Sequence, residues 1–175
     1  MSEGWYELVQ GADLQQGDIL IQCPVCWPVM YFDPNESTHV TFKSATYDVV
    51  ILSQTCDLVA GREKVQLVVV SPLAAWSEIE SHDRHWLKNR GELKKASKHE
   101  LPAFFVLPEY KADDFVRELS VVHFRQIYTL PVEFLREHAH RNGKRLRLQS
   151  PYREQLSQHF GAFFQRVAVP APVRI

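Results

Sequence analysis

The sequence predicts an α+β fold, a small, bent, mainly antiparallel sheet or barrel with a helical insertion and a C-terminal helix. Residues 47–53 and 65–70 are short, apolar and rich in β-branched side chains, which is typical of strands buried on both faces. Later segments repeat apolar side chains every three or four positions, as amphipathic helices do. A length of 175 residues fits one domain. We expect a single domain over residues 1–175, with a β-rich core at about 14–72 and 103–128, a helical insertion at about 73–98 and C-terminal helices at about 131–167.

The first third of the chain contains the expected start of the sheet. Gly17 and Asp18 form a turn that leads into a strand at residues 19–21. The two prolines within residues 23–28 exclude a helix there and disfavour a central strand. Residues 39–42 alternate between polar and apolar side chains and therefore predict another strand.

The two most apolar runs, 47–53 and 65–70, are predicted to be neighbours in one sheet. Residues 61–64 have the length and chemistry of a hairpin loop between them. Ser71 and Pro72 should end the second strand, because proline cannot donate to a sheet ladder.

The second half of the chain is predicted to alternate helices with strands. Apolar side chains recur at helical spacing over residues 73–97, and two strands are expected at 103–107 and 119–124. Pro131 should open a helix that runs to about residue 140, where Asn142 and Gly143 supply a C-terminal stop. The last helix is predicted to start at Ser150 and Pro151, which suit the N-cap and the first helical position.

Composition places the chain among ordinary globular proteins. Hydrophobic residues make up 45% and aromatic residues 11%, which is enough for a packed core. No apolar run approaches the roughly 18 to 20 residues of a membrane span, and the N-terminus lacks the pattern of a secretory signal. Three cysteines do not suggest a disulfide framework. We therefore expect a cytoplasmic protein with reduced thiols and no membrane partner.

The net charge of −1 is unevenly distributed along the chain. Residues 1–60 carry eight acidic residues and one basic residue, whereas residues 61–175 carry thirteen acidic and nineteen basic residues. A basic second part is typical of a surface for nucleic acid or for an acidic partner. The alternative is that the two parts neutralise each other within the fold.

A run of polar or reactive side chains directly follows the most apolar strand. Many folds present site residues at the end of a rigid strand. We take the run as the candidate catalytic site, with Cys56 beside Asp57 as a nucleophile or a metal-ligand pair. The alternative is that the polar residues cap a loop and that Cys56 packs as a small apolar side chain. The five residues are Ser53, Gln54, Thr55, Cys56 and Asp57.

The cysteines could form two other kinds of site, a zinc site and a hydrolase site. Cys23 and Cys26 form half of a zinc signature, but no second close pair accompanies them, so we expect no metal and no cofactor. A Cys-dependent hydrolase would need a histidine base beside Cys56. The sequence does not select among three candidates for that base: His39, His99 and His123.

Two basic stretches, residues 84–98 and 136–153, have aromatic side chains nearby. Lysine and arginine side chains with aromatic neighbours are suited to binding phosphate backbones and stacked bases. The alternative is a solvated helix face with apolar stems lying along the surface. The predicted nucleic-acid-binding residues are Lys94, Lys95, Arg125, Arg145, Arg147 and Arg153.

Residues 17–20, Gly-Asp-Ile-Leu, followed about thirty residues later by Val-Val-Ile-Leu-Ser at 49–53, resemble the opening of MazF/PemK-type toxins of toxin–antitoxin systems. The similarity covers residues 14–72. It implies an SH3-like barrel, and RNA as a target, since many members cleave single-stranded RNA. Separately, residues 53–58, 150–153 and 163–167 are similar to a set of uncharacterised bacterial proteins, a likeness that implies no function.

The chain departs from the toxin pattern in two ways. The family has an Arg-Pro pair just before the second motif, and that Arg takes part in catalysis, whereas Thr46, Tyr47 and Asp48 stand here. The toxins are also shorter, without the helical insertion and the C-terminal helix. The resemblance therefore implies the barrel together with an altered or inactive endoribonuclease.

Three hypotheses for function follow, and the sequence leaves open whether the protein is an enzyme. The first is a nucleic-acid-associated domain that binds RNA or DNA through the basic second half. The second is a protein-interaction module without catalysis, which forms a homodimer or binds a protein partner through the C-terminal helix with Phe163 and Phe164. The third is a hydrolase that uses Cys56 and Asp57.

Overall fold

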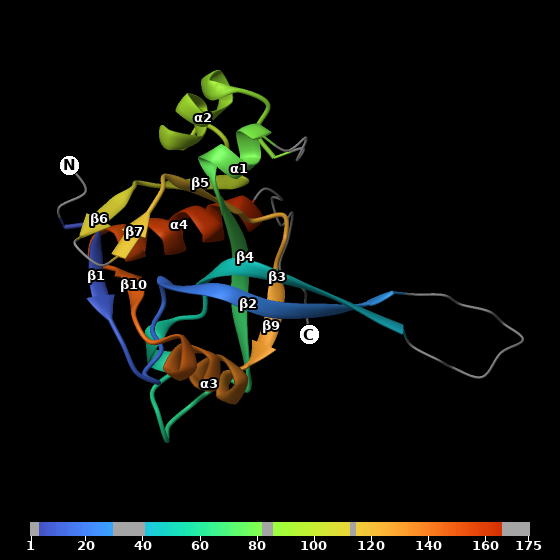
Figure 1. Ribbon diagram of the computed structural model, residues 1–175, viewed down its shortest axis with the longest axis vertical. Helices are drawn as coiled ribbons and strands as arrows, with labels where there is room; N and C mark the ends of the chain where they lie inside the picture. The colour runs from blue at the N-terminus through green and yellow to red at the C-terminus, as the bar shows by residue number, and fades with distance from the viewer. Residues whose placement is uncertain (1–3, 30–40, 82–85, 113–114, 166–175) are drawn as a thin grey trace, which may run out of the picture.

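The computed structural model describes residues 4–29, 41–81, 86–112 and 115–165, and its centre is an eight-stranded antiparallel sheet (Figure 1). The strand order is β1 (Tyr6–Val9), β10 (Arg145–Leu148), β2 (Asp18–Val29), β3 (Thr41–Ile51), β4 (Leu67–Ala75), β8 (Ser120–His123) and β5 (Phe104–Leu107), and β9 (Tyr128–Pro131) also pairs with β4. The hairpin of β6 (Tyr110–Ala112) and β7 (Phe115–Arg117) stands apart. The helices are η1 (Thr55–Asp57), α1 (Trp76–Ser81), α2 (Arg90–Ser97), α3 (Val132–Asn142) and α4 (Tyr152–Phe164). The predicted α+β class, with helices after β4 and at the C-terminal end, is confirmed.

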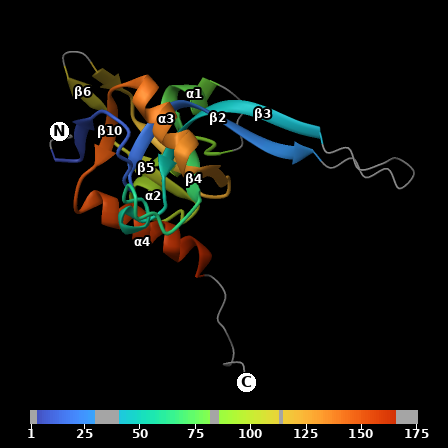
Figure 2. The same cartoon turned by 90° about the horizontal axis from the view of Figure 1, so that it is seen from below.

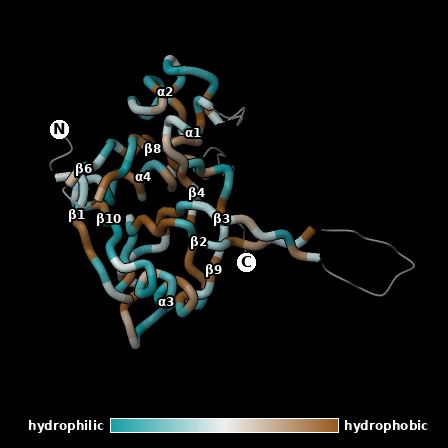
Figure 3. Tube along the Cα trace, in the orientation of Figure 1, coloured by the Kyte–Doolittle hydropathy of each residue, from teal (hydrophilic) through white to brown (hydrophobic). Residues whose placement is uncertain are grey.

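The inner end of the central strand β3, residues 49–51, is buried on both faces, as its sequence predicts. Val49 and Ile51 belong to a core cluster that includes Leu135 of α3. Val50, which lies between them, belongs to a second cluster that includes Leu156 of α4. Because side chains alternate along a strand, the two helices cover opposite faces of the sheet (Figures 1 and 2). Apolar stretches gather where the strands cross the centre, whereas α2 is mostly hydrophilic (Figure 3).

Strands β2 and β3 form a long hairpin whose outer part projects from the rest of the molecule (Figures 1 and 2). Strand β2 pairs with β10 only at Asp18 and Ile19. Pro24 and Pro28 lie further along β2, where β3 is the one strand paired with it among the described residues. Proline is tolerated at such an edge. Of the strand predicted over residues 39–42, the first two residues lie outside the described part of the chain.

The prediction that Ser71 and Pro72 end the strand formed by the apolar run 65–70 is wrong. Strand β4 continues to Ala75 and changes its second neighbour on the way, from β9 to β8. Pro72 lies between these two ladders, where a missing N–H is tolerated. The predicted pairing of the two apolar runs is confirmed, because β3 and β4 are antiparallel neighbours.

The helical insertion is shorter and more divided than predicted. Residues 73–75 belong to β4, and two short helices, α1 and α2, follow. Asn89 starts α2, because its side chain accepts a hydrogen bond of 3.0 Å from the backbone N–H of Glu92. The Glu92 carboxylate in turn accepts from the backbone N–H of Lys88 at 2.7 Å.

Five short strands, β1, β6, β7, β9 and β10, were not predicted. The most consequential is β10, since the sequence treats its Arg-Leu-Arg-Leu as part of a basic surface although all four residues are buried. Helix α3 follows Pro131 and runs to Asn142, slightly further than predicted. The predicted stop is there, because Gly143 adopts a φ of 75° directly after the helix. Helix α4 starts after Pro151 without the predicted side-chain cap from Ser150. No helix in the described part of the chain combines the length and apolarity needed to cross a lipid bilayer.

Candidate functional site

The predicted polar run forms the turn after β3, and two of its members hold that turn in place. The Ser53 hydroxyl accepts a hydrogen bond of 2.8 Å from the backbone N–H of Val69. The Asp57 carboxylate lies 3.5 Å from the ammonium of Lys64. The backbone carbonyl of Asp57 accepts a hydrogen bond from the backbone N–H of Lys64. For Ser53 and Asp57 the structure therefore supports the loop-capping alternative.

The other three members, Gln54, Thr55 and Cys56, line a shallow pocket of about 400 Å³ against the first turns of α4. We call it the turn pocket. Thr55 is fixed from the other side, because its hydroxyl accepts from the backbone N–H of Gln16 at 3.2 Å. The pocket is lined by Gln16, Gln54, Thr55, Cys56, Arg153, Glu154, Ser157 and Gln158. Four of these residues, Gln16, Glu154, Ser157 and Gln158, carried no sequence signal.

Arg153 joins two separate sequence predictions in one place. It was predicted as a nucleic-acid contact, and α4 brings it to the polar run. Its guanidinium is paired with Glu154, at 2.8 Å from Nη2 to Oε1. Of the six predicted basic residues, all of which the structure describes, Arg153 is the one that lines this pocket. The turn pocket therefore offers amides, hydroxyls, the Cys56 thiol and one arginine that is paired with a glutamate.

Cys56 has no histidine among the residues that line the turn pocket. Its Sγ lies 3.7 Å from Oε1 of Gln54 and 3.6 Å from Oδ1 of Asp57. His123 packs between the rings of Trp86 and Phe104 in a different cluster. His99 packs against Phe105 and His159, and His39 lies outside the described residues. Among the residues that the structure describes, no histidine is therefore placed to act as a base for Cys56.

Arg145 and Arg147 do not belong to a nucleic-acid surface, because both are buried against a carboxylate. Asp18 is fully buried, and its Oδ2 accepts from Nε of Arg145 and from Nη2 of Arg147, each at 2.9 Å. Both guanidiniums also donate to the backbone carbonyl of Asp13. These two predicted contacts are corrected to a buried ion-pair network. Lys94, Lys95 and Arg125 are exposed, as a nucleic-acid contact requires.

The two cysteines of the partial zinc signature lie in different surroundings. Both are on β2, three positions apart, so their side chains point to opposite faces. Cys23 is buried and Cys26 is exposed. Burial, reinforced by the charge of Asp48, raises the pKa of the Cys23 thiol to about 12. Within the described residues, no group of three or more His, Cys, Asp or Glu side chains is arranged to hold a metal ion.

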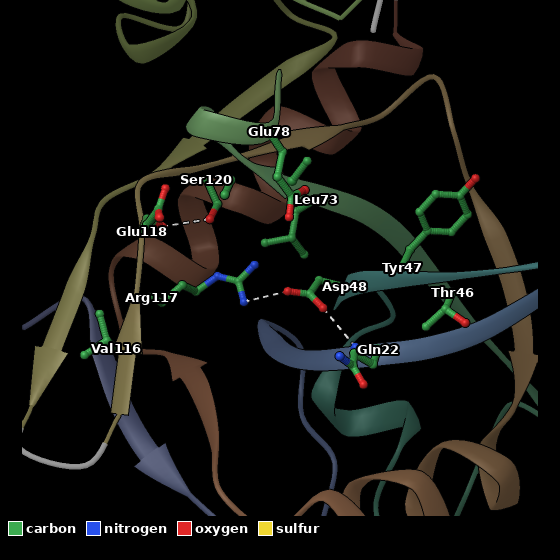
Figure 4. Close-up of a pocket in the computed structure, with 12 residues that line it drawn as sticks. Gln22, Thr46, Tyr47, Asp48, Leu73, Glu78, Val116, Arg117, Glu118 and Ser120 are labelled. Atoms are coloured by element: carbon green, nitrogen blue, oxygen red, sulfur yellow. Dashed lines mark hydrogen bonds and ion pairs between the residues drawn. The ribbon is translucent and has the colours of Figure 1, made fainter. Parts of the chain in front are cut away.

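A second and larger pocket, of about 660 Å³, opens where β3 separates from β4 (Figure 4). We call it the fork pocket. The ladder between the two strands ends at the pair Asp48–Leu73, and beyond it β3 continues with β2 while β4 continues with β8. The pocket is lined by Gln22, Thr46, Tyr47, Asp48, Leu73, Ala74, Ala75, Glu78, Val116, Arg117, Glu118 and Ser120.

An ion pair crosses the inner end of the fork pocket. Nη1 of Arg117 lies 3.0 Å from Oδ2 of Asp48, and Oδ1 of Asp48 accepts from the backbone N–H of Gln22 at 2.8 Å (Figure 4). Gln22 adopts a φ of 48° at the bulge in β2, which aims its N–H at the carboxylate. One signal for this pocket is visible in the sequence, namely a charged Asp48 inside the most apolar run.

Comparison with known proteins adds no relationship. No family model and no curated protein matches this chain. The resemblance to the MazF/PemK toxins therefore stays a prediction, and function is argued from the two pockets alone.

Proposed function

We propose that the protein binds single-stranded RNA in the turn pocket. The observation that carries the proposal is the convergence of Arg153 with the Gln54–Cys56 segment at one open surface. Arginine suits the phosphate backbone, and glutamine amides and hydroxyls suit the hydrogen-bonding edges of unpaired bases. A shallow, open pocket fits a splayed strand better than it fits a small molecule enclosed on all sides.

We expect the turn pocket to bind RNA without cleaving it. No histidine or metal cluster accompanies Cys56 among the described lining residues, so the pocket lacks the base that Cys56 would need to act as a nucleophile. The place where the toxins have their catalytic Arg is occupied by residues 46–48, and the Asp48 carboxylate there is paired with Arg117. This reading agrees with the expectation of an altered or inactive endoribonuclease.

The first test is fluorescence anisotropy with labelled single-stranded RNA and duplex DNA at about 50 and 200 mM salt. We expect saturable RNA binding that weakens with salt, and uncut RNA on a denaturing gel. The variant Arg153→Gln should weaken binding by about tenfold, which corresponds to about 1.4 kcal/mol. Gln158→Ala should change the preference among homopolymeric RNAs more than the salt dependence.

Arg141→Gln is the matched control for this experiment. Arg141 is also a helical arginine paired with a carboxylate of its own helix, Glu137 on α3, but it does not line the turn pocket. Equal loss of affinity in the two arginine variants would show unspecific charge attraction and would contradict the proposal. Absence of RNA binding at the lower salt concentration would contradict it outright.

A further inference from the structure

We propose that the fork pocket binds a small organic cation, an ammonium or guanidinium group on an aliphatic stem. This site shares no residue with the turn pocket and does not depend on RNA binding. A cavity of about 660 Å³ lies within the range of small-molecule sites. Its floor includes the buried side chains of Leu73 and Ala74, which suit an aliphatic stem.

The charge of the lining selects a cation. Three carboxylates, Asp48, Glu78 and Glu118, line the pocket with a single arginine, Arg117. The lining therefore carries two more negative than positive charges, and a cleft lined by one sign of charge concentrates ligands of the opposite sign. Because the described carboxylates are not clustered as metal ligands, they suit an extended organic cation better than a metal ion.

Hydrogen bonds hold two of the carboxylate residues, Asp48 and Glu118, in place. Oε2 of Glu118 accepts from the Ser77 hydroxyl at 2.6 Å. The backbone carbonyl of Glu118 accepts from the Ser120 hydroxyl at 2.8 Å (Figure 4). The Asp48 carboxylate is held by Gln22 and Arg117, yet a carboxylate has about four acceptor positions. Fixed acceptors reduce the conformational entropy that binding would otherwise cost.

Arg117 is the second, independent sign of a ligand. Its side chain is only 9% exposed and is directed across the pocket to Asp48 (Figure 4). Its Nε is buried and has no hydrogen-bond partner among the described residues. A buried donor without an acceptor is costly. A ligand that carries a carboxylate beside its cationic group, as a free basic amino acid does, would supply that acceptor once the Arg117 side chain turns towards it.

The test is isothermal titration calorimetry of the full chain with agmatine, spermidine and L-arginine, at matched ionic strength. Tetramethylammonium, a cation that donates no hydrogen bonds, is the control ligand. We expect saturable binding of at least one of the three amines and none of tetramethylammonium. Tighter binding of L-arginine than of agmatine, with a shift of the Arg117 Nε–H resonance, would assign the ligand to the amino acids, and the reverse order to the simple amines.

Glu118→Gln should weaken binding at least fivefold. Glu80→Gln is the matched control, since Glu80 is exposed on α1 but does not line the pocket. Equal isotherms for the two variants, or no saturable binding by any of the three amines, would overturn the proposal. Arg153→Gln should leave amine binding unchanged, so failure of the RNA proposal and failure of this one are distinguishable.

Discussion

Asp18 shows how a single buried residue can reverse a sequence prediction. Arg145 and Arg147 were predicted to lie on a basic surface, because residue type and local spacing say nothing about a partner that lies 127 and 129 residues away. Once β10 pairs with β2, the two guanidiniums meet Asp18. The ion-pair network needs all three residues, since each charge is buried.

Asp18→Asn should lower the free energy of unfolding by about 3–5 kcal/mol, because it removes the buried counter-charge that the two guanidiniums share. Urea unfolding followed by circular dichroism measures the loss. Asp13→Asn is the control, because the Asp13 carboxylate also pairs with Arg147, at 3.7 Å, but is largely exposed. We expect Asp13→Asn to lower the free energy of unfolding by less than about 1 kcal/mol. Similar losses in the two variants would contradict a buried network centred on Asp18.

His123 gives the fold a predicted sensitivity to acid. The side chain is buried between aromatic rings, and burial, together with the charge of Arg125, lowers its pKa to about 4. In the unfolded chain a histidine has a pKa of about 6.5. Below that pH the unfolded chain binds a proton that the folded chain does not, so stability should fall between about pH 6.5 and pH 4, by roughly 3 kcal/mol.

The variant His123→Gln isolates this contribution from that of the carboxylates. We expect the free energy of unfolding of His123→Gln to depend less on pH between about 6.5 and 4 than that of the unchanged protein. His140→Gln, a substitution at an exposed position on α3, should keep the original dependence. A parallel pH profile for all three proteins would show that His123 does not titrate differently on unfolding.

At the scale of elements, α4 was predicted from its pattern, but its environment was not. Its aromatic stripe was predicted to face either the sheet or a partner. In the structure Phe160 and Phe163 pack against the cluster that contains Phe124, whereas Phe164 is 56% exposed. Of the two phenylalanines predicted to form a partner interface, Phe164 is therefore the exposed one. The interface itself stays a prediction.

Phe163→Ser should lower the free energy of unfolding by about 2–3 kcal/mol, because it removes a ring packed against two core clusters. Phe164→Ser should change it by less than about 0.5 kcal/mol. Thermal unfolding and size-exclusion chromatography of both variants separate core from interface. A Phe163→Ser variant of full stability would contradict the packing, and a changed oligomeric state in Phe164→Ser alone would favour the interface.

At the scale of the whole molecule, the acidic first part and the basic second part meet in the fold. Asp48 pairs with Arg117 and Asp57 with Lys64, in addition to the network around Asp18. The uneven charge along the sequence is thus partly neutralised, as the alternative interpretation expected. Lys94, Lys95, Arg125 and Arg153 remain as the predicted nucleic-acid contacts.

The α+β class and the two central strands could be predicted because β3 and β4 contain continuous apolar runs, at residues 49–52 and 67–70, and such runs carry a strong local signal. Short strands such as β1 and β10 could not, since their burial depends on distant neighbours. For the same reason the sequence predicted the consecutive residues 54–56 of the turn pocket, but neither their contact with Arg153 nor most of the fork pocket. The fork pocket joins Asp48 to Arg117 across 69 positions of the chain.

The projecting hairpin has a consequence for how the protein avoids aggregation. Beyond Ile19 the outer edge of β2 has no ladder among the described residues, and a bare strand edge is a template on which another chain can add a strand. Pro24 and Pro28 lack the N–H that such an addition needs. The carbonyl of Ile21 is already occupied by the side chain of Asn142, at 3.0 Å. We therefore expect the outer edge of β2 to be a poor template for intermolecular β-structure.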